Sequence, residues 1–319
     1  MNSSFAEKRK IKSIKRILPF FRSALKDCGL CFRKCGVNRL KGKKGFCSAG
    51  SKAVIYCYGP HFGEEPPLSG KNGSGAIFFS GCSMKCVYCQ NHRFSQNLCS
   101  GKECSSRELA AIMIELQQQG CHNINLVNPT HYMSTIIEAL ECAYEEGLRV
   151  PLVYNTGGYD SFDMIRMLEG VIDIYLPDMR YSDDFLAGKY SDAEGYTENN
   201  KTLVKEMYRQ TGLLACTKNI ARKGLIIRLL ILPGAVSGTE ETLEFLAGEL
   251  GQGVSISVMS QYYPAYKAKD YIELSQGITQ KEYTSVMNQM EKLKLRMGWV
   301  QPFSADFDER FAGENLNSH

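Results

Sequence analysis

The sequence predicts an α/β protein built on a partial (β/α)6 TIM-like barrel, with a cysteine-rich extension before it. From Ala76 onward, short apolar runs alternate with amphipathic stretches, which favours a parallel sheet with right-handed crossovers. A closed eight-unit barrel takes about 250 residues. The regular part ends near residue 300 and holds fewer than eight units, so we expect an open or partial barrel.

Six apolar runs are the predicted strands. They are "AIFFS" (76–80), "HNINLVN" (122–128), "VPLVYN" (150–155), "VIDIYLPD" (171–178), "LIIRLLIL" (225–232) and "VSISVMSQ" (254–261). Helical periodicity predicts helices at 105–120, 133–146, 160–168, 198–212, 239–249 and 279–295. Two of them begin with a capping box, formed by Ser105 with Glu108 and by Thr279 with Glu282.

The chain divides into a basic segment (1–27), the cysteine-rich extension (28–75), the regular part (76–300) and a C-terminal tail (301–319). The basic segment is expected to be a short helix or disordered, and the extension to be mostly loop. From Met1 to Gly63, 15 Lys and Arg residues stand against Glu7 and Asp27. This charge suits an acidic partner or a solvated tail about equally. Because aromatic and basic residues do not interleave here in the way typical of single-strand-binding proteins, nucleic acid is not an expected partner.

The cysteines indicate metal binding. No 18-residue apolar run occurs, and the patch "ILPFF" is too short for a signal peptide, so we expect a cytoplasmic protein without a membrane span. There, thirteen cysteines do not form a disulfide framework. Seven lie in two tight groups, as metal ligands do. The other six are expected to be mainly small buried hydrophobic residues: Cys57, Cys99, Cys104, Cys121, Cys142 and Cys216.

The stretch "GCSMKCVYCQN" (81–91) places Cys82, Cys86 and Cys89 directly after the first predicted strand. Each of the four irons of a [4Fe–4S] cluster takes an outer ligand, so three cysteines leave one iron open to a small molecule. Active sites of parallel α/β proteins gather at the carboxyl ends of the strands. The alternative is a structural zinc or cluster site that takes a fourth ligand from His92 or Cys99.

The second group has four cysteines at the spacing C-x2-C-x3-C-x11-C: Cys28, Cys31, Cys35 and Cys47. Such a set predicts either a closed zinc site or a second [4Fe–4S] cluster, and the spacing does not choose between them. The first would be structural, and the second could relay electrons.

The three-cysteine motif after the first strand of a partial barrel resembles the radical S-adenosylmethionine superfamily. The chain resembles more closely an uncharacterised branch of proteins similar to the pyruvate formate-lyase activating enzyme. The matching stretches run from about residue 28 to 300: "LCFRKCGVNR", "GCSMKCVYCQN", "NLVNPTHY", "YNTGGYD", "DIYLPDMRYSD", "RLLILPG" and "MSQYYP".

The resemblance implies a chemistry. Cys82, Cys86 and Cys89 would bind three irons, and S-adenosylmethionine the fourth. One electron, from a donor such as flavodoxin or ferredoxin, would release a 5′-deoxyadenosyl radical that takes a hydrogen atom from a substrate. The substrate would be a glycyl-radical enzyme, another protein or a small molecule. The resemblance also implies that Tyr88 packs against the cluster or an adenine ring.

The remaining implied contacts lie at strand ends. Where the superfamily has a Gly-Gly-Glu-like turn, this chain has "VNPTHY", so that Asn128, Thr130 and His131 would receive the methionine amino group. A solvated ring at a helix start is the alternative for His131. Further polar residues end later strands, among them Thr156 and Gln261.

Four more residues have implied roles. Asn155 would meet the ribose or carboxylate of the ligand. Asp178 and Arg180 resemble the Asp-x-Lys pair that organises the site in glycyl-radical activases, with a planar guanidinium in place of the ammonium. Arg228 would reach the methionine carboxylate or form an internal ion pair. The alternative function is a non-catalytic iron–sulfur electron carrier or a zinc-binding protein that interacts with nucleic acid, although a carrier seldom needs so large a scaffold.

Overall fold

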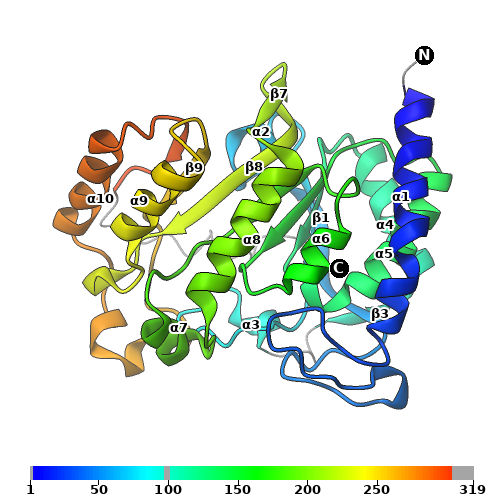
Figure 1. Cartoon of the computed structure of the whole chain (residues 1–319), viewed down its shortest axis with the longest axis horizontal. Helices are drawn as coiled ribbons and strands as arrows, with labels where there is room; N and C mark the ends of the chain where they lie inside the picture. Colours follow the sequence, from blue (N-terminus) through cyan, green and yellow to red (C-terminus); the bar gives the residue numbers. More distant parts are fainter. Residues whose placement is uncertain (1–2, 97–100, 304–319) are drawn as a thin grey trace.

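The computed structural model describes residues 3–96 and 101–303, so Cys99 and most of the predicted C-terminal tail lie outside the described residues. The described strands form one sheet in the order β10-β9-β8-β6-β5-β4-β2-β1-β3, and β7 (Ala215–Thr217) pairs with β8 beside this path. The protein is therefore a mixed α/β structure with a large, mainly parallel sheet (Figure 1).

All six predicted strands are present. They are β2 (Ser74–Phe79), β4 (Ile124–Val127), β5 (Leu152–Thr156), β6 (Ile174–Pro177), β8 (Ile220–Leu230) and β9 (Ser255–Met259). Each is parallel to the next in chain order. Strands β2, β4, β5 and β6 are buried along their whole length, as expected of a parallel sheet covered on both faces.

The six predicted helices are also present. They are α4 (Ser106–Gln118), α5 (Met133–Glu145), α6 (Phe162–Met167), α8 (Tyr196–Thr211), α9 (Thr239–Glu249) and α10 (Gln280–Lys292). Both predicted capping boxes form, at Ser105 with Glu108 and at Thr279 with Glu282. The apolar faces of α4 and α5 are fully buried and supply part of the core: Leu109, Met113, Leu116, Ile136, Ile137 and Leu140.

The basic N-terminal segment is ordered, contrary to the disordered alternative. Helix α1 (Ser3–Ser23) runs alongside α5 (Figure 1) and buries Ile14, Ile17 and Phe21 completely or nearly so. Several of its basic residues pair with acids: Lys10 contacts Asp173, while Lys15 and Arg22 lie 3.2 and 2.9 Å from carboxylates on α5. The apolar stripe, hidden among lysines in the sequence, is what anchors this helix.

Residues 28–75 are more regular than expected. Strand β1 (Ala53–His61) lies antiparallel to β2 and continues the sheet toward β3 (Lys102–Cys104). The short helix α2 (Pro66–Ser69) joins β1 to β2. The expectation of loop alone was wrong here, because tertiary pairing gives a strand to a stretch with only partial burial of its side chains.

Further short elements escaped prediction. They are α3 (His92–Ser95), α7 (Asp184–Ser191), β10 (Gly298–Val300) and the 3-10 turns Arg39–Lys41, Thr130–Tyr132, Pro233–Ala235, Ala268–Asp270 and Ile272–Leu274. None of the helices described here combines the length and apolar character needed to cross a bilayer.

The first part of the extension docks beside the cysteine motif. Cys31 forms an isolated β-bridge with Asp160, after β5. Arg33 donates a hydrogen bond from Nε to the Ser83 carbonyl, at 2.8 Å. In Figure 1 this segment is the dark-blue loop at the lower edge, on the side of the molecule where α3 lies. The two cysteine groups are thus neighbours in space.

Candidate functional site

The cysteine motif forms a loop between β2 and α3, at the carboxyl end of β2. Gly81 leaves the strand with φ of 86°, a conformation that favours glycine. Two backbone N–H groups of the loop, those of Lys85 and Val87, donate to carbonyls of Ser191 and Tyr190 at 2.9 and 2.8 Å. The loop is therefore held from outside as well as by its own turns.

Each motif sulfur has a polar neighbour. The Met84 N–H lies 3.4 Å from Cys82 Sγ, the Ser191 hydroxyl 3.0 Å from Cys86 Sγ, and the Ser95 hydroxyl 3.1 Å from Cys89 Sγ. Burial raises the pKa of Cys82 to about 12 and also raises the pKa of Cys89. Buried thiols of this kind ionise when a metal replaces the proton, and N–H and O–H donors then stabilise the thiolates. The donor set fits an iron–sulfur cluster.

The arrangement does not fit a single metal ion. Across the described ranges, no three His, Cys, Asp or Glu side chains lie close enough to hold one ion. A cubane distributes its ligands over separate irons, so its cysteines need not converge on one point. His92, the candidate fourth ligand, lies with Nδ1 3.1 Å from the Cys89 carbonyl and stacks on Tyr266. The other candidate, Cys99, is outside the described residues.

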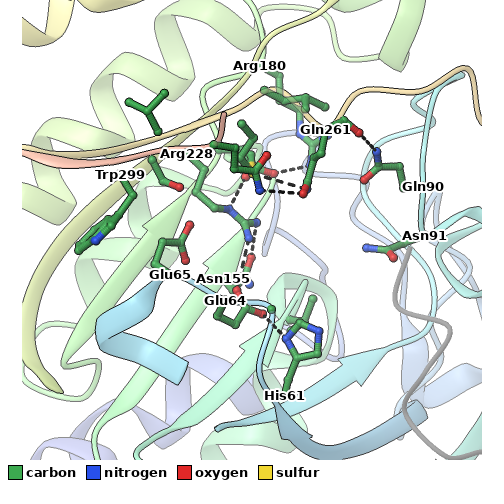
Figure 2. Close-up of a pocket in the computed structure, with 18 of the residues that line it drawn as sticks. His61, Glu64, Glu65, Gln90, Asn91, Asn155, Arg180, Arg228, Gln261 and Trp299 are labelled. Atoms are coloured by element: carbon green, nitrogen blue, oxygen red, sulfur yellow. Dashed lines mark hydrogen bonds and ion pairs between the residues drawn. The ribbon is translucent and has the colours of Figure 1, made fainter. Parts of the chain in front are cut away.

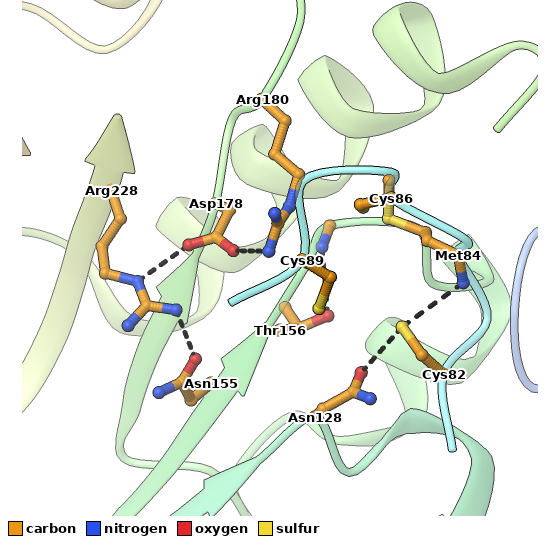
Figure 3. A network of polar contacts seen from close by, with 12 residues as sticks. Cys82, Met84, Cys86, Cys89, Asn128, Asn155, Thr156, Asp178, Arg180 and Arg228 are labelled. Atoms are coloured by element: carbon orange, nitrogen blue, oxygen red, sulfur yellow. Dashed lines mark hydrogen bonds and ion pairs between the residues drawn. The ribbon is translucent and has the colours of Figure 1, made fainter. Parts of the chain in front are cut away.

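A charged network stands beside the loop (Figure 3). Arg228 donates from Nε to Asp178 at 2.8 Å and from a terminal nitrogen to Asn155 Oδ1 at 2.7 Å. Arg180 binds the second oxygen of Asp178. Burial alone lowers the pKa of both guanidinium groups, but the Asp178 carboxylate together with the other acidic groups around each one raises the pKa overall. The internal ion pair predicted for Arg228 is confirmed, and its contact with a ligand carboxylate stays a prediction.

Asn128 braces the cysteine loop from the end of β4. Its backbone is left-handed, with φ of 57°, which asparagine tolerates better than most residues. The side chain donates from Nδ2 to the Gly81 carbonyl at 2.7 Å, and its Oδ1 lies 3.8 Å from Cys82 Sγ. The structure thus places the predicted residue at the site, in contact with the motif itself.

Thr130 and His131 point away from the site. The Thr130 hydroxyl donates to Asp160 at 2.6 Å, and His131 Nε2 donates to the Ser80 carbonyl at 2.8 Å. His131 is 1% exposed, so the solvated-ring alternative was wrong. Burial lowers its pKa to about 3, which keeps the ring neutral. The 3-10 turn after β4 directs both side chains inward, and neither lines the cavity described next.

A cavity of about 450 Å³ opens beside the network. Figure 2 labels ten of its lining residues: His61, Glu64, Glu65, Gln90, Asn91, Asn155, Arg180, Arg228, Gln261 and Trp299. Tyr88 and Cys89 also line it, which connects the cavity to the cysteine loop. The walls come from both β10 and the end of β1, strands far apart in the sheet order. The sheet therefore curves around this space.

Tyr88 is a rigid part of the wall. It is 2% exposed and packs edge-on against Tyr181 and Tyr262, with ring centroids 6.4 and 6.1 Å away. Its predicted contact with a cluster or adenine stays a prediction. Gln90, next to Cys89, donates to the Gln261 carbonyl at 3.0 Å, and so ties the cysteine loop to the end of β9.

Sequence reasoning missed the acidic side of the cavity. Glu64 lies 3.7 Å from Arg228 and 3.4 Å from His61. Burial acts to raise the pKa of Glu64, but these partners lower it overall. Glu65 is 8% exposed, and burial raises its pKa. The run "GEEPPLSG" contains the signal, since two adjacent acids stand among Pro and Gly, but Gly and Pro content indicated only a loop.

The second cysteine group surrounds a buried arginine. A terminal nitrogen of Arg39 lies 3.1 Å from Cys28 Sγ and 3.6 Å from Cys47 Sγ, and its other terminal nitrogen donates to the His131 carbonyl. Burial raises the pKa of Cys31 to about 12. Neither the zinc alternative nor a second cluster is decided by this arrangement. A second cluster stays a prediction.

Comparisons with known proteins give relatives but no family. No protein-family model matches the chain. "Uncharacterized protein MJ0674" of Methanocaldococcus jannaschii is 29% identical over 288 residues, which cover 86% of this chain and 77% of the relative.

Three solved structures are similar at a low level. Streptococcus suis SuiB has a TM-score of 0.48 and 12% identity, and the match covers 69% of this chain and 47% of that chain. The FeFe-hydrogenase maturase HydG from Carboxydothermus hydrogenoformans has a TM-score of 0.47 and 16% identity, with coverage of 69% and 50%. A second structure of HydG, a maturase of the [FeFe]-hydrogenase, has a TM-score of 0.48 and 11% identity, with coverage of 93% and 64%. The chain thus spans about half of the first two solved chains and 64% of the third. These scores and identities are too low to assign a family or an activity.

Proposed function

We propose that this protein is a radical S-adenosylmethionine enzyme. One observation carries the proposal: Cys82, Cys86 and Cys89 lie at the carboxyl end of the first parallel strand, each with a hydrogen-bond donor at its sulfur. Among the residues the structure describes, no fourth ligand joins them, and a cavity of about 450 Å³ begins at Cys89. This is the arrangement of a metal centre that keeps one position for a small molecule.

The bound cluster and S-adenosylmethionine would together supply a 5′-deoxyadenosyl radical that removes a hydrogen atom from the substrate. The chain's own residues hold and shield the site. The three cysteines bind the cluster, and Asn128 fixes their loop through the Gly81 carbonyl. Tyr88 closes the wall against water.

The charged network suits a ligand that carries both charges. Asp178 offers negative charge, while Arg180 and Arg228 offer guanidinium N–H groups at the same strand ends. The amino and carboxylate groups of a methionine moiety are of this kind. We assign to Asn155 and the network the task of orienting such a ligand.

The finer proposals concern the architecture, substrate and partners. Six parallel strands in chain order, each followed by a helix, support a partial (β/α)6 barrel. The Asp178–Arg180 pair supports membership of the branch similar to the pyruvate formate-lyase activating enzyme, and with it a glycyl-radical enzyme as substrate. A cytoplasmic one-electron donor such as flavodoxin or ferredoxin would deliver the electron.

The alternative functions have less support. An electron carrier has no need of the cavity. A nucleic-acid-binding role would draw on the basic residues of α1, but Lys10, Lys15 and Arg22 are paired with acids of the same chain.

Anaerobic reconstitution with iron and sulfide, followed by dithionite and S-adenosylmethionine, tests the proposal. We expect 5′-deoxyadenosine, measured by chromatography, and its loss by at least about 100-fold in Cys82→Ala, because one iron loses its ligand. Cys142→Ala is the matched control, since Cys142 lies on α5 outside both cysteine groups. A reconstituted cluster that produces no 5′-deoxyadenosine overturns the proposal.

A further inference from the structure

Glu65 occupies a built position on one side of the cavity. It is the residue before α2, and its carbonyl accepts hydrogen bonds from Leu68 and Ser69 at 2.8 and 3.1 Å. Pro66 and Pro67 follow it and restrict the backbone further. The side chain lines the cavity and is 8% exposed (Figure 2). A carboxylate is thus presented to this space from a stiff segment.

Each of the cations that line the cavity already has an acidic partner in the same chain. Arg228 uses its three nitrogens toward Asp178, Asn155 and Glu64, and Arg180 pairs with Asp178. His61 lies against Glu64. The carboxylates of Asp178 and Glu64 therefore each have a direct cationic partner, whereas no ion pair is formed by Glu65 with the described residues.

One oxygen of Glu65 is left without any partner. Oε2 is buried and accepts no hydrogen bond from the part of the chain that the structure describes. A buried polar atom costs free energy unless it is hydrogen-bonded, and a buried charge costs more unless it is paired. Burial raises the pKa of Glu65, and the nearby Arg228 and Ser257, which lower it, do not offset this effect. A ligand that brings a donor, above all a positively charged one, would satisfy this oxygen.

The same cavity also has an apolar surface. Trp299, Phe78, Val127, Leu230 and Met259 also line the cavity. In Figure 2, Trp299 stands on the same side as Glu65. A ligand with a cationic nitrogen and an aliphatic chain could satisfy both features, since indole faces attract cations.

We infer that Glu65 binds a positively charged nitrogen of the substrate, an ammonium or guanidinium group, and holds the substrate's aliphatic part against Trp299. The chemistry has two sources, a small free amine or the side chain of a lysine or arginine in a polypeptide. The name substrate rests on the proposed function, but the binding does not require a cluster or S-adenosylmethionine. Cation binding by Glu65 and the proposed radical chemistry can therefore be tested independently of each other.

Trp299 provides the readout, because it is the single tryptophan of the chain. The full chain, purified anaerobically, is titrated with butylammonium, butylguanidinium and an end-blocked tripeptide with a central lysine, while tryptophan emission is recorded. Butanol and butyrate are the neutral and anionic counterparts. We expect a saturable change with at least one cation, at a concentration at least about tenfold below that needed for butanol. The peptide and the free cations distinguish the two sources.

Two variants refine the test. Glu65→Gln keeps the shape and removes the charge, so cation binding should weaken at least about tenfold while butanol binding stays unchanged. Glu198→Gln, at an exposed pair with Lys201, is the control. If Glu65→Gln fails to fold, the inference is still tested by whether the wild type binds the cation more tightly than butanol.

Equal affinity for cation and butanol, or unchanged cation affinity in a folded Glu65→Gln, overturns the inference. Competition between the cation and S-adenosylmethionine also overturns it, because Glu65 would then contact the cofactor rather than the substrate. Cation binding without 5′-deoxyadenosine formation would leave the inference standing and sink only the proposed radical chemistry.

Discussion

The Asp178 carboxylate holds two guanidinium groups at the ends of three neighbouring strands. Arg228 reaches it from β8 at 2.8 Å and continues to Asn155 on β5. In a buried network, the orientation of each group depends on the others, because an unpaired charge is costly there. The same network leaves Glu65 as the acid of this cavity without an ion-pair partner among the described residues, which is why the two acids of "GEEPPLSG" have different roles.

At the residue scale, we predict that the buried His131 makes the folded protein less stable as the pH falls. Its pKa is about 3 in the folded chain, below the ordinary value of 6.5, because burial disfavours the charged ring. Between these values the unfolded chain binds a proton at His131 and the folded chain does not. The contribution of His131 to stability is therefore full above pH 6.5 and is lost as the pH falls toward 3, by at most about 1.4 kcal/mol per pH unit.

Urea unfolding of wild type and His131→Gln between pH 7 and pH 4 checks this prediction. Glutamine can still donate to the Ser80 carbonyl, but it does not titrate. The free energy of unfolding should fall more steeply with decreasing pH in the wild type than in the variant. Parallel curves would show that the ring is not buried as described.

At the element scale, β10 closes one edge of the sheet and carries Trp299 into the cavity. Gly298 begins this strand with φ of 125°, and a Cβ there would collide with the backbone of Ile256 on β9. The short strand has exposed side chains at both ends, so pairing and close approach, rather than burial, hold it in place. Propensity alone does not identify such a strand.

We expect Gly298→Ala to displace β10 and to lower the free energy of unfolding by roughly 1–3 kcal/mol, the usual range for a strained backbone position. Trp299 emission should shift toward that of exposed indole. Gly277→Ala is the matched control, because its Cβ would meet no atom within 4 Å. Wild-type emission and stability in the Gly298 variant would contradict the described packing.

At the scale of the whole molecule, the N-terminal extension joins the two cysteine groups. Arg33 contacts the Ser83 carbonyl inside the motif loop, and Arg39 links Cys28 and Cys47 to the His131 carbonyl. His131 in turn holds the Ser80 carbonyl, two residues before Cys82. A structural change at one cysteine group can therefore reach the other through this short chain of hydrogen bonds.

Of the two options for the N-terminal group, a second cluster or a zinc ion, we put the cluster to the test. Cys28→Ala combined with Cys47→Ala should halve the iron and sulfide content after anaerobic reconstitution, because one of two clusters is lost. Metal analysis by mass spectrometry measures iron and zinc together, with Cys142→Ala as control. Unchanged iron in the double variant, or zinc in the wild type at the expense of iron, contradicts the prediction.

Much of the fold could be predicted from the amino-acid sequence alone. Apolar periodicity located the six parallel strands and six of the helices, and the capping boxes marked two helix starts, because these features depend on neighbours in the sequence. The three-cysteine motif was predictable for the same reason, since its spacing lies within one loop. So were the positions of Asn155 and Asp178 at strand ends.

Only the tertiary structure decided how these parts meet. The curvature of the sheet brings Trp299 and Glu65 to one cavity although 234 positions separate them in the sequence, from 65 to 299. The turn after β4 sends Thr130 and His131 into the interior, while Asn128 stays at the motif. Burial and pairing are properties of the packed chain, and a carboxylate's role depends on which cations are left to neutralise it. For that reason the sequence predicted the position of the candidate site, and the fold selected the residues that surround it.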